Sequence, residues 1–184
     1  TAPATPGICN FQWKMVDDAG ANIGWFGPQT PSVSIPVGLV STDIAITGNE
    51  NDIEEQLSTG NLAGSSDLEF VFADEGIPSR GDQAVGLRFQ NVSVPKGVQV
   101  SNAYIQFKGD AGSAGSGGAI TMTIAGDDTD NSAAFAGDYN VTGRTKTTAK
   151  VTWSPSAWSA GSAGSAERTA NIAPIIQEII DRAG

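Results

Sequence analysis

Apolar and polar residues alternate along most of the chain, which is the pattern of short β-strands. Within several segments an apolar residue recurs at every second position, and this spacing places the apolar side chains on one face of a strand. These residues are Val33/Ile35/Val37, Ile44/Ile46, Leu68/Phe70/Phe72, Val85/Leu87/Phe89, Ala103/Ile105/Phe107, Ile120/Met122/Ile124 and Val151/Trp153. Gly, Asn, Pro and Asp separate the segments and favour turns. The pattern predicts an all-β chain folded as an antiparallel β-sandwich.

The C-terminal segment has a different period. Its isoleucines, Ile172, Ile175, Ile176, Ile179 and Ile180, recur at i, i+3, i+4, i+7 and i+8, which is one stripe of an α-helix. Asn171 before them suits an N-cap, and Pro174 suits the first turn. At about 2 kcal/mol for each buried isoleucine, the stripe contributes on the order of 10 kcal/mol before conformational entropy is subtracted. We expect a short C-terminal α-helix that closes one end of the sandwich. An amphipathic membrane helix is the alternative, although the segment lacks a basic face.

Charge and composition exclude several classes of function. The chain has 20 acidic and 10 basic residues, a net charge of −10 and a pI near 4.2. Such a protein repels phosphate backbones and anionic lipids, so we expect no nucleic-acid partner. No apolar run reaches the length of a membrane span, so we expect no membrane insertion. There is no histidine, which rules out a Ser-His-Asp triad, a Cys-His pair and a histidine zinc site.

The first residues indicate export. The chain begins at Thr1 within the stretch TAPATP rather than at a methionine, which fits an N-terminus left after a leader has been removed; a cut made elsewhere would look the same. Cys9 is the only cysteine, so no internal disulfide forms. It either cross-links two chains or remains a partly buried thiol. We expect a secreted protein that works outside the cell or at the cell surface.

From about Asn51 onward the chain resembles a family of bacterial extracellular β-sandwich modules related to the disaggregatase-related repeats and to carbohydrate-binding modules. The matching stretches are 51–55 (NDIEE), 65–69 (SSDLE), 85–89 (VGLRF), 91–97 (NVSVPKG), 101–107 (SNAYIQF), 129–131 (TDN), 151–155 (VTWSP) and 175–179 (IIQEI). Their order and spacing agree over about 130 residues. The resemblance implies a jelly-roll-like sandwich, an extracellular location, calcium and carbohydrate as ligands, and no enzymatic activity. The chain departs from the family at Ser162 and Asn171, where acids are usual.

The resemblance also divides the chain. Residues 49–184 correspond to the β-sandwich module, and residues 1–48 lie outside it. We expect residues 1–48 to form an N-terminal extension, extra strands, or a surface used for assembly.

The acidic residues are concentrated in two places. Ten of them lie between Asp43 and Asp82, where Arg80 is the only base, and a second group follows the predicted strand that ends at Ile124. Calcium takes six to eight oxygen ligands in flexible geometry, and two acidic loops folded together would supply them. The candidate ligands are Asp52, Glu54, Glu55, Asp127 and Asp130. The alternative interpretation is a solvated acidic surface whose charges are screened by salt.

Exposed aromatic rings are the candidate sugar contacts, because sugars present flat C–H faces that pack on aromatic rings. The candidates are Tyr104, Trp158, Tyr139 and Trp25. Tyr104 lies on the polar side of its predicted strand, and Trp158 lies in a loop rich in Pro, Ser and Gly. Trp153 continues the apolar face of its strand and is expected in the core.

These patterns predict a non-catalytic extracellular module that binds a polysaccharide or a cell-surface glycan, or that mediates adhesion, with calcium as a stabilising ion. The alternative is a structural subunit of a surface layer or filament, in which a strand from the N-terminal segment pairs with the edge of a neighbouring copy. A third interpretation, a glycosidase with paired carboxylates, requires a cleft that the sequence does not indicate.

Overall fold

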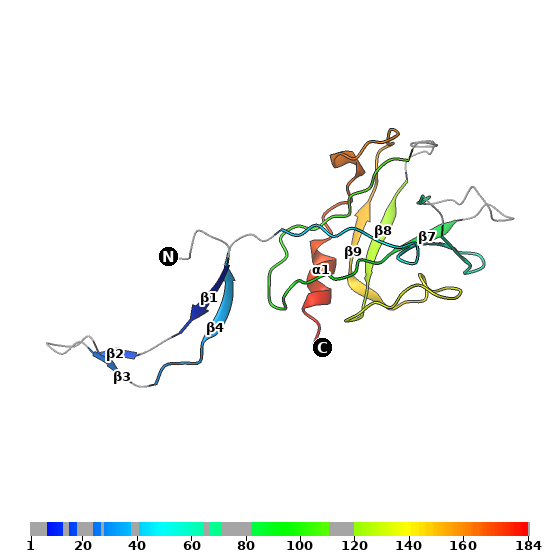
Figure 1. Ribbon diagram of the computed structural model, residues 1–184. Helices are drawn as coiled ribbons and strands as arrows, with labels where there is room; N and C mark the ends of the chain where they lie inside the picture. The colour runs from blue at the N-terminus through cyan, green and yellow to red at the C-terminus, as the bar shows by residue number, and fades with distance from the viewer. Residues whose placement is uncertain are drawn as a thin grey trace. The chain divides into compact units, whose positions relative to one another are not determined.

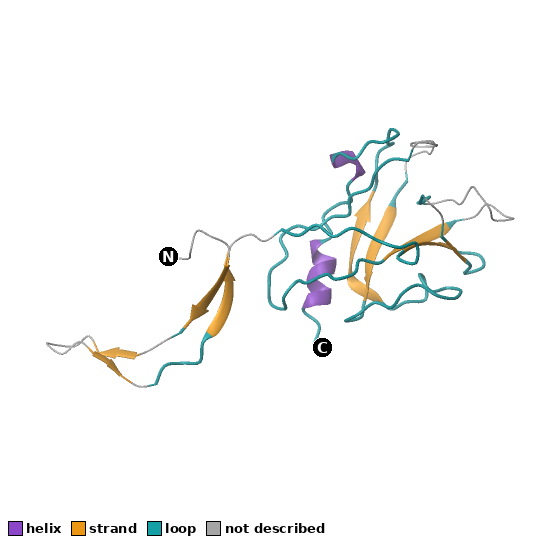
Figure 2. Ribbon diagram, in the orientation of Figure 1, coloured by secondary structure: helices purple, strands orange, loops and turns teal. Residues whose placement is uncertain are grey.

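The structure is a computed structural model that describes residues 7–12, 15–17, 24–26, 28–37, 41–64, 67–70, 82–110 and 120–183. The chain divides into two compact units, Thr1–Asp43 and Ile44–Gly184. Among the described residues every ladder between strands is antiparallel, and the single α-helix is short (Figures 1 and 2). The protein is therefore built mainly from antiparallel β-structure, as the alternating pattern predicts.

The first unit contains two small antiparallel ladders. Strand β1 (Gly7–Phe11) pairs with β4 (Val33–Val37), and β2 (Met15–Asp17) pairs with β3 (Gly24–Phe26). The alternation from Val33 to Val37 predicts β4, whereas the irregular sequence before it gives no comparable signal for β1, β2 and β3. Each ladder has two strands in the described part of the chain. Two-stranded ladders are marginally stable in water without further packing.

The second unit begins with a three-stranded sheet in the order β6-β5-β7. These strands are β5 (Asp52–Gln56), β6 (Leu62–Ala63) and β7 (Gln83–Leu87). The alternation predicts β7, but β5 has four consecutive buried residues and three of them are polar. A Cβ atom at Gly86 would lie 2.7 Å from the ring of Phe135, so β7 needs a glycine where that ring packs. The predicted position of Phe72 lies outside the described residues.

The second sheet pairs β8 (Met122–Asp127) with β9 (Lys146–Trp153), with an irregularity in register between Ala125 and Asp127. Helix α1 (Ala173–Ile180) packs against these strands (Figure 1). A Cβ atom at Gly126 would lie 2.8 Å from both Ile175 and Ile179, so the glycine allows the close approach of the helix. Ile175 is only 3% exposed, which confirms that the isoleucine stripe is buried at this position.

The helix boundaries differ slightly from the expected ones. The N-cap is Ile172, one residue after the expected Asn171. Asn171 Oδ1 nevertheless accepts the backbone N–H of Ala173 at 3.0 Å and so satisfies one donor of the first turn. The helix ends at Ile180, the last isoleucine of the predicted stripe. In the part of the chain that the structure describes, no helix is both long enough and apolar enough to cross a membrane.

Residues 101–110 form a ladder with residues 161–172, although the pairing is too irregular to make a named strand. Gln106 and Arg168 form an antiparallel bridge, and backbone hydrogen bonds join Phe107 N to Glu167 O and Thr169 N to Ile105 O. The short 3-10 helix η1 (Ser165–Glu167) interrupts the second segment. The predicted alternation from Ala103 to Phe107 is thus paired, whereas Ile44 and Ile46 lie in irregular chain.

Candidate functional site

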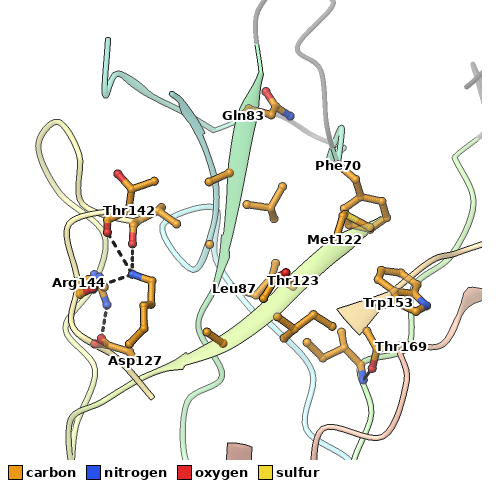
Figure 3. A pocket seen from close by; sticks show the side chains of 18 of the residues that line it. Phe70, Gln83, Leu87, Met122, Thr123, Asp127, Thr142, Arg144, Trp153 and Thr169 are labelled. Atoms are coloured by element: carbon orange, nitrogen blue, oxygen red, sulfur yellow. Dashed lines mark hydrogen bonds and ion pairs between the residues drawn. The ribbon is translucent and has the colours of Figure 1, made fainter. Parts of the chain in front are cut away.

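An open cleft of about 530 Å3 lies between β7 and β8 (Figure 3). Apolar side chains from both sheets and from the paired segment 101–110 contribute most of its lining. The main ones are Val85, Leu87, Ile105, Met122, Ile124 and Phe135. Trp153 and Phe70 lie near one end of the cleft, and Arg144 and Asp127 lie near the other (Figure 3). The cleft is therefore a mainly apolar groove with the Arg144–Asp127 pair at one end, and the exposed Asp82 also lines it.

The lining shows that the cleft is bordered by strand edges. Residues 82–87 and residues 121–125 all line it without a break. The face of a strand presents every second residue, so an unbroken run indicates that the backbone edge itself is turned toward the groove. β7 ends the order β6-β5-β7, and β8 pairs only with β9 among the described residues. In the described part of the chain, each of these strands thus has one edge that pairs with no other strand, and such an edge presents N–H and C=O groups.

Four aromatic rings pack together at one end of the groove, and three of them, Phe70, Phe107 and Trp153, line it. The ring centroid of Phe70 lies 4.8 Å from Phe107, 5.6 Å from Trp153 and 5.5 Å from Trp158, with edge-to-face geometry in each pair. Phe107 stacks on both tryptophans. The Nε1–H of Trp158 donates to the backbone oxygen of Ala166 at 3.1 Å. Aromatic pairs of this geometry are worth about 0.5–1.5 kcal/mol each beyond burial, so this end of the cleft is a rigid wall.

The opposite end is held by Arg144. Its Nη1 contacts Asp127 Oδ2 at 2.9 Å, and its Nε donates to the backbone oxygen of Asn140 at 2.6 Å. The guanidinium carbon lies 4.3 Å from the centroid of Phe135. A second hydrogen bond, from the hydroxyl of Ser132 at 2.8 Å, also reaches Asp127 Oδ2. These contacts fix the loop after β8 and leave Arg144 and Asp127 neutralised by each other.

Lys146 lies beside this pair and donates to backbone oxygens. Its Nζ lies 2.5 Å from the oxygen of Val141 and 2.9 Å from the oxygen of Arg144. Burial lowers the pKa of Lys146, and the nearby carboxylate of Asp127 partly offsets this effect. Because three carbonyls already accept from this ammonium group, the charged end is a closed structural network rather than an open anion site.

Gln83 provides an unsatisfied polar atom at the cleft. The residue is 8% exposed, and its Nε2 donates to Glu54 Oε1 at 3.0 Å and to the backbone oxygen of Glu69. Its Oε1 is buried without a hydrogen-bond partner in the described structure. A buried acceptor without a partner costs about 1–3 kcal/mol. Because Gln83 lines the cleft, a molecule bound in the cleft can donate a hydrogen bond to this oxygen.

The five candidate calcium ligands do not lie together in the described structure. Glu55 is fully buried and accepts from the N–H groups of Val141 and Thr142, and Glu54, 4% exposed, accepts from Glu69 N at 2.5 Å. Asp52 begins the same strand and is half-buried. The carboxylates of Glu54 and Glu55 thus already have protein donors, as buried acids require.

The acidic loop after β8 carries the other two candidates. Asp127 is paired with Arg144, and Asp130 Oδ1 contacts Arg182 Nε at 2.8 Å. Arg182 also pairs with Asp128, and the hydrogen bonds to Asp130 and Asp128 raise the pKa of Arg182. Among the described residues no group of three or more acids or thiols has the geometry to hold a metal ion. An arginine occupies the position between Asp128 and Asp130 where a cation would bind.

The candidate sugar-binding aromatics have different surroundings. Trp158 belongs to the aromatic wall, and Tyr139, 48% exposed, packs its ring on Gly60. Tyr104 is 42% exposed, and the guanidinium carbon of Arg168 lies 4.6 Å from its ring centroid. Trp25 lies in β3, and its side chain is outside the description. No ring contact joins these candidates to one another among the residues described.

The fold and the site define an antiparallel β protein with a mainly apolar cleft between β7 and β8, whose edges toward the cleft pair with no strand among the residues that the structure describes. No protein-family model matches the chain, and no curated protein or solved structure matches it. Sequence reasoning missed the cleft residues Gln83 and Thr123, because nothing in the alternation says which strands remain unpaired. The sequence did offer one signal, because the segments from Gln83 to Leu87 and from Ile120 to Gly126 contain no charged residue. Charged residues usually protect an edge strand from pairing, so an uncharged strand that lies at an edge remains able to pair.

Proposed function

We propose that this protein is a non-catalytic extracellular assembly module whose cleft between β7 and β8 binds an extended polypeptide strand. The observation that carries the proposal is the unbroken lining by residues 82–87 and 121–125, which turns two backbone edges toward one apolar groove. A strand placed there pairs with backbone groups and buries alternate side chains, which is the mode of β-strand addition. The unsatisfied Oε1 of Gln83 adds an acceptor for the occupant.

The proposal includes the finer architecture. The sheets β6-β5-β7 and β8-β9 are taken as the two layers of a jelly-roll-like β-sandwich, with the segment 101–110 extending the second layer. The sequence resemblance to extracellular β-sandwich modules supports both the architecture and the location outside the cell.

Sedimentation velocity with edge variants tests strand binding. Thr123 is exposed on β8 and lines the cleft, so Thr123→Lys places a charge on the edge, as natural edge strands do to prevent pairing. Thr152 lies directly opposite Thr123 on β9, is exposed and does not line the cleft, so Thr152→Lys is the matched control. We expect the wild-type chain and Thr152→Lys to associate as concentration rises and Thr123→Lys to remain monomeric.

Hydrogen exchange provides an independent measurement. The amides of β7 and β8 that face the cleft should exchange quickly in dilute monomer and become protected on association. Association that leaves both strands unprotected would mean that another surface joins the molecules, and the cleft would then have no role in assembly.

Glycan binding is the second candidate function, and the Tyr104 surface favours it. Arg168 Nε contacts Gln106 Oε1 at 2.7 Å while its guanidinium covers the Tyr104 ring. An aromatic ring beside planar hydrogen-bonding groups is a suitable surface for a sugar. Tyr104→Ala should reduce binding on a polysaccharide array, whereas Val92→Ala, at another exposed apolar residue, should leave it unchanged. Cleavage of a bound polysaccharide would contradict the non-catalytic part of the proposal.

Calcium stabilisation is part of the same proposal and has a specific test. Because Arg182 pairs with Asp128 and Asp130, calcium at this loop must compete with an internal cation. Arg182→Ala releases both carboxylates, so calcium should raise its melting temperature by more than that of the wild-type chain, and a chelator should reverse the increase. Equal melting curves with calcium and with chelator in both proteins would contradict calcium binding here.

A further inference from the structure

We propose that the strand which fills the cleft is β4, Val33–Val37, supplied by a second copy of this chain. The inference rests on the proposed function, because it names the partner of the same cleft. It assigns the donor to one unit of the molecule and the acceptor to the other unit.

The chemistry of β4 fits the groove. Val33, Ile35 and Val37 alternate with Ser34 and Pro36, and the strand carries no charge. The cleft is apolar along most of its length; Arg144 and Asp127 pair with each other, and Asp82 and Lys146 are the other charged residues of its lining. A neutral strand with one apolar face therefore loses little hydration on entering and gains apolar burial.

The lengths also match. β4 and β7 both contain five residues, and β8 contains six. At about 3.3 Å per residue, five residues span about 17 Å, so β4 can pair along nearly the full edge of either cleft strand. Pro36 lacks an N–H and removes one backbone hydrogen bond near the end of the strand. A proline at this place is compatible with an edge strand, and it leaves the backbone from Val33 to Ile35 complete.

The first unit also has exposed apolar groups that need a partner. Ile8 is 73% exposed and Val33 is 56% exposed, although both lie in the paired strands β1 and β4. The β1–β4 ladder has no third strand among the described residues, and such a ladder is marginal in water. Addition of β4 to the edge of a larger sheet gives the ladder further strands and covers Val33, whereas Ile8, opposite Pro36, lies on the other face.

The donor and the acceptor are different surfaces, so the contact between copies is heterologous. Such contacts form rings when the rotation between copies closes and open filaments when it does not. The expected product is thus a chain or ring of copies rather than a symmetric dimer that stops at two. A copy with a defective β4 strand and a copy with a defective cleft should therefore still form one contact, in which the intact β4 strand of the second copy enters the intact cleft of the first.

The test mixes two variants that each lack one half of the contact. Val33→Lys damages the donor and keeps the cleft, whereas Thr123→Lys damages the cleft and keeps the donor. Ser34→Lys is the matched control for the donor, because Ser34 is the exposed neighbour whose side chain bonds Asn10 instead. Circular dichroism and thermal melting of each variant establish that it is folded before association is measured.

By sedimentation velocity, Val33→Lys alone and Thr123→Lys alone should be monomers, and their equimolar mixture should form a 1:1 dimer that grows no further. Ser34→Lys should assemble like the wild-type chain. If Val33→Lys assembles normally and Thr123→Lys does not, the cleft binds a different strand, so this inference fails while the proposed function stands. If Thr123→Lys also assembles normally, the proposed function fails as well.

A cross-linking experiment separates a second copy from the same copy. In a Cys9→Ala background, Val33→Cys and Thr123→Cys are placed either on two differently tagged chains or together on one chain. Disulfides between the tagged chains support the inference. The control replaces Thr123→Cys by Lys150→Cys, at an exposed residue of β9 that does not line the cleft, and should give a weaker yield. A disulfide only within the doubly substituted chain, in a monomeric protein, overturns it.

Discussion

The carboxylate of Glu55 accepts the backbone N–H of Val141 at 2.6 Å, although 86 residues separate the two. The same carboxylate accepts the N–H of Thr142 at 3.1 Å and the hydroxyl of Thr142. Glu55 is fully buried, so no water replaces these donors. A buried acid in the middle of β5 thus holds the loop that forms one end of the cleft.

Removal of this carboxylate should strongly destabilise the second unit. Glu55→Ala leaves the buried N–H of Val141 without an acceptor, together with the N–H and hydroxyl of the exposed Thr142. We therefore expect the free energy of unfolding to fall by about 1–3 kcal/mol. Glu55→Gln keeps one acceptor and should lose less. Urea denaturation measures both. Asp138→Asn, an exposed acid in the same loop, should change stability by less than about 0.5 kcal/mol; an equal loss there would contradict the role given to Glu55.

The contact between α1 and β8 depends on the absence of a side chain at Gly126. Gly126→Ala places a methyl group within 2.8 Å of Ile175 and Ile179, and the helix must move outward to admit it. We expect a loss of about 1–3 kcal/mol in thermal or urea unfolding. Gly164→Ala is the control, because a Cβ atom there meets only ordinary contacts. A melting curve for Gly126→Ala equal to that of the control would mean that the helix does not pack this closely.

The pH dependence of stability should include a contribution from Glu167. The hydroxyl of Ser162 donates to its Oε1 at 2.6 Å and lowers the pKa of Glu167, and the backbone N–H of Gly164 acts in the same direction. The folded state therefore stays ionised at a pH where the unfolded chain binds a proton. The stabilisation is complete above the ordinary pKa of 4.5 and is lost as pH falls through the lower folded pKa.

Urea midpoints measured at a series of pH values test this assignment. Glu167→Gln should be less stable than the wild-type chain at neutral pH, and the difference should shrink in acid. Asp138→Asn should follow the wild-type curve. A constant difference between Glu167→Gln and wild type over the whole range would show that the effect is not due to ionisation.

Substitution of the two aromatic candidates should separate packing from binding. Trp158 contacts Phe70, Phe107 and Trp153, so Trp158→Ala should lower stability by about 2 kcal/mol or more. Tyr104→Ala, at an exposed ring, should change stability by less than about 1 kcal/mol. Calorimetric melting distinguishes the two. The sequence instead favours an exposed, sugar-binding role for Trp158, and an unchanged melting temperature of Trp158→Ala would restore that interpretation.

Local patterns predicted the strands that have one apolar face and the helix that has one apolar stripe. β4, β7, β8, β9 and α1 follow from spacing alone, because period two and period 3.6 each commit the chain to one geometry. β5 was not predicted, since its residues Glu54, Glu55 and Gln56 are polar and yet buried. Their burial depends on donors from distant segments, such as Val141 and Gln83, that no local window contains.

The order of residues by itself determined which segments extend, which segment coils into a helix, the acidic character of the chain, and the absence of histidine chemistry. Only the tertiary structure decided that Glu54 and Glu55 bond to protein donors, that Arg182 pairs with Asp128 and Asp130, and that the edges of β7 and β8 border an apolar cleft. The physical reason is that alternation fixes the face of a strand, whereas the neighbour of each edge and the partner of each buried charge depend on contacts between residues far apart in the chain.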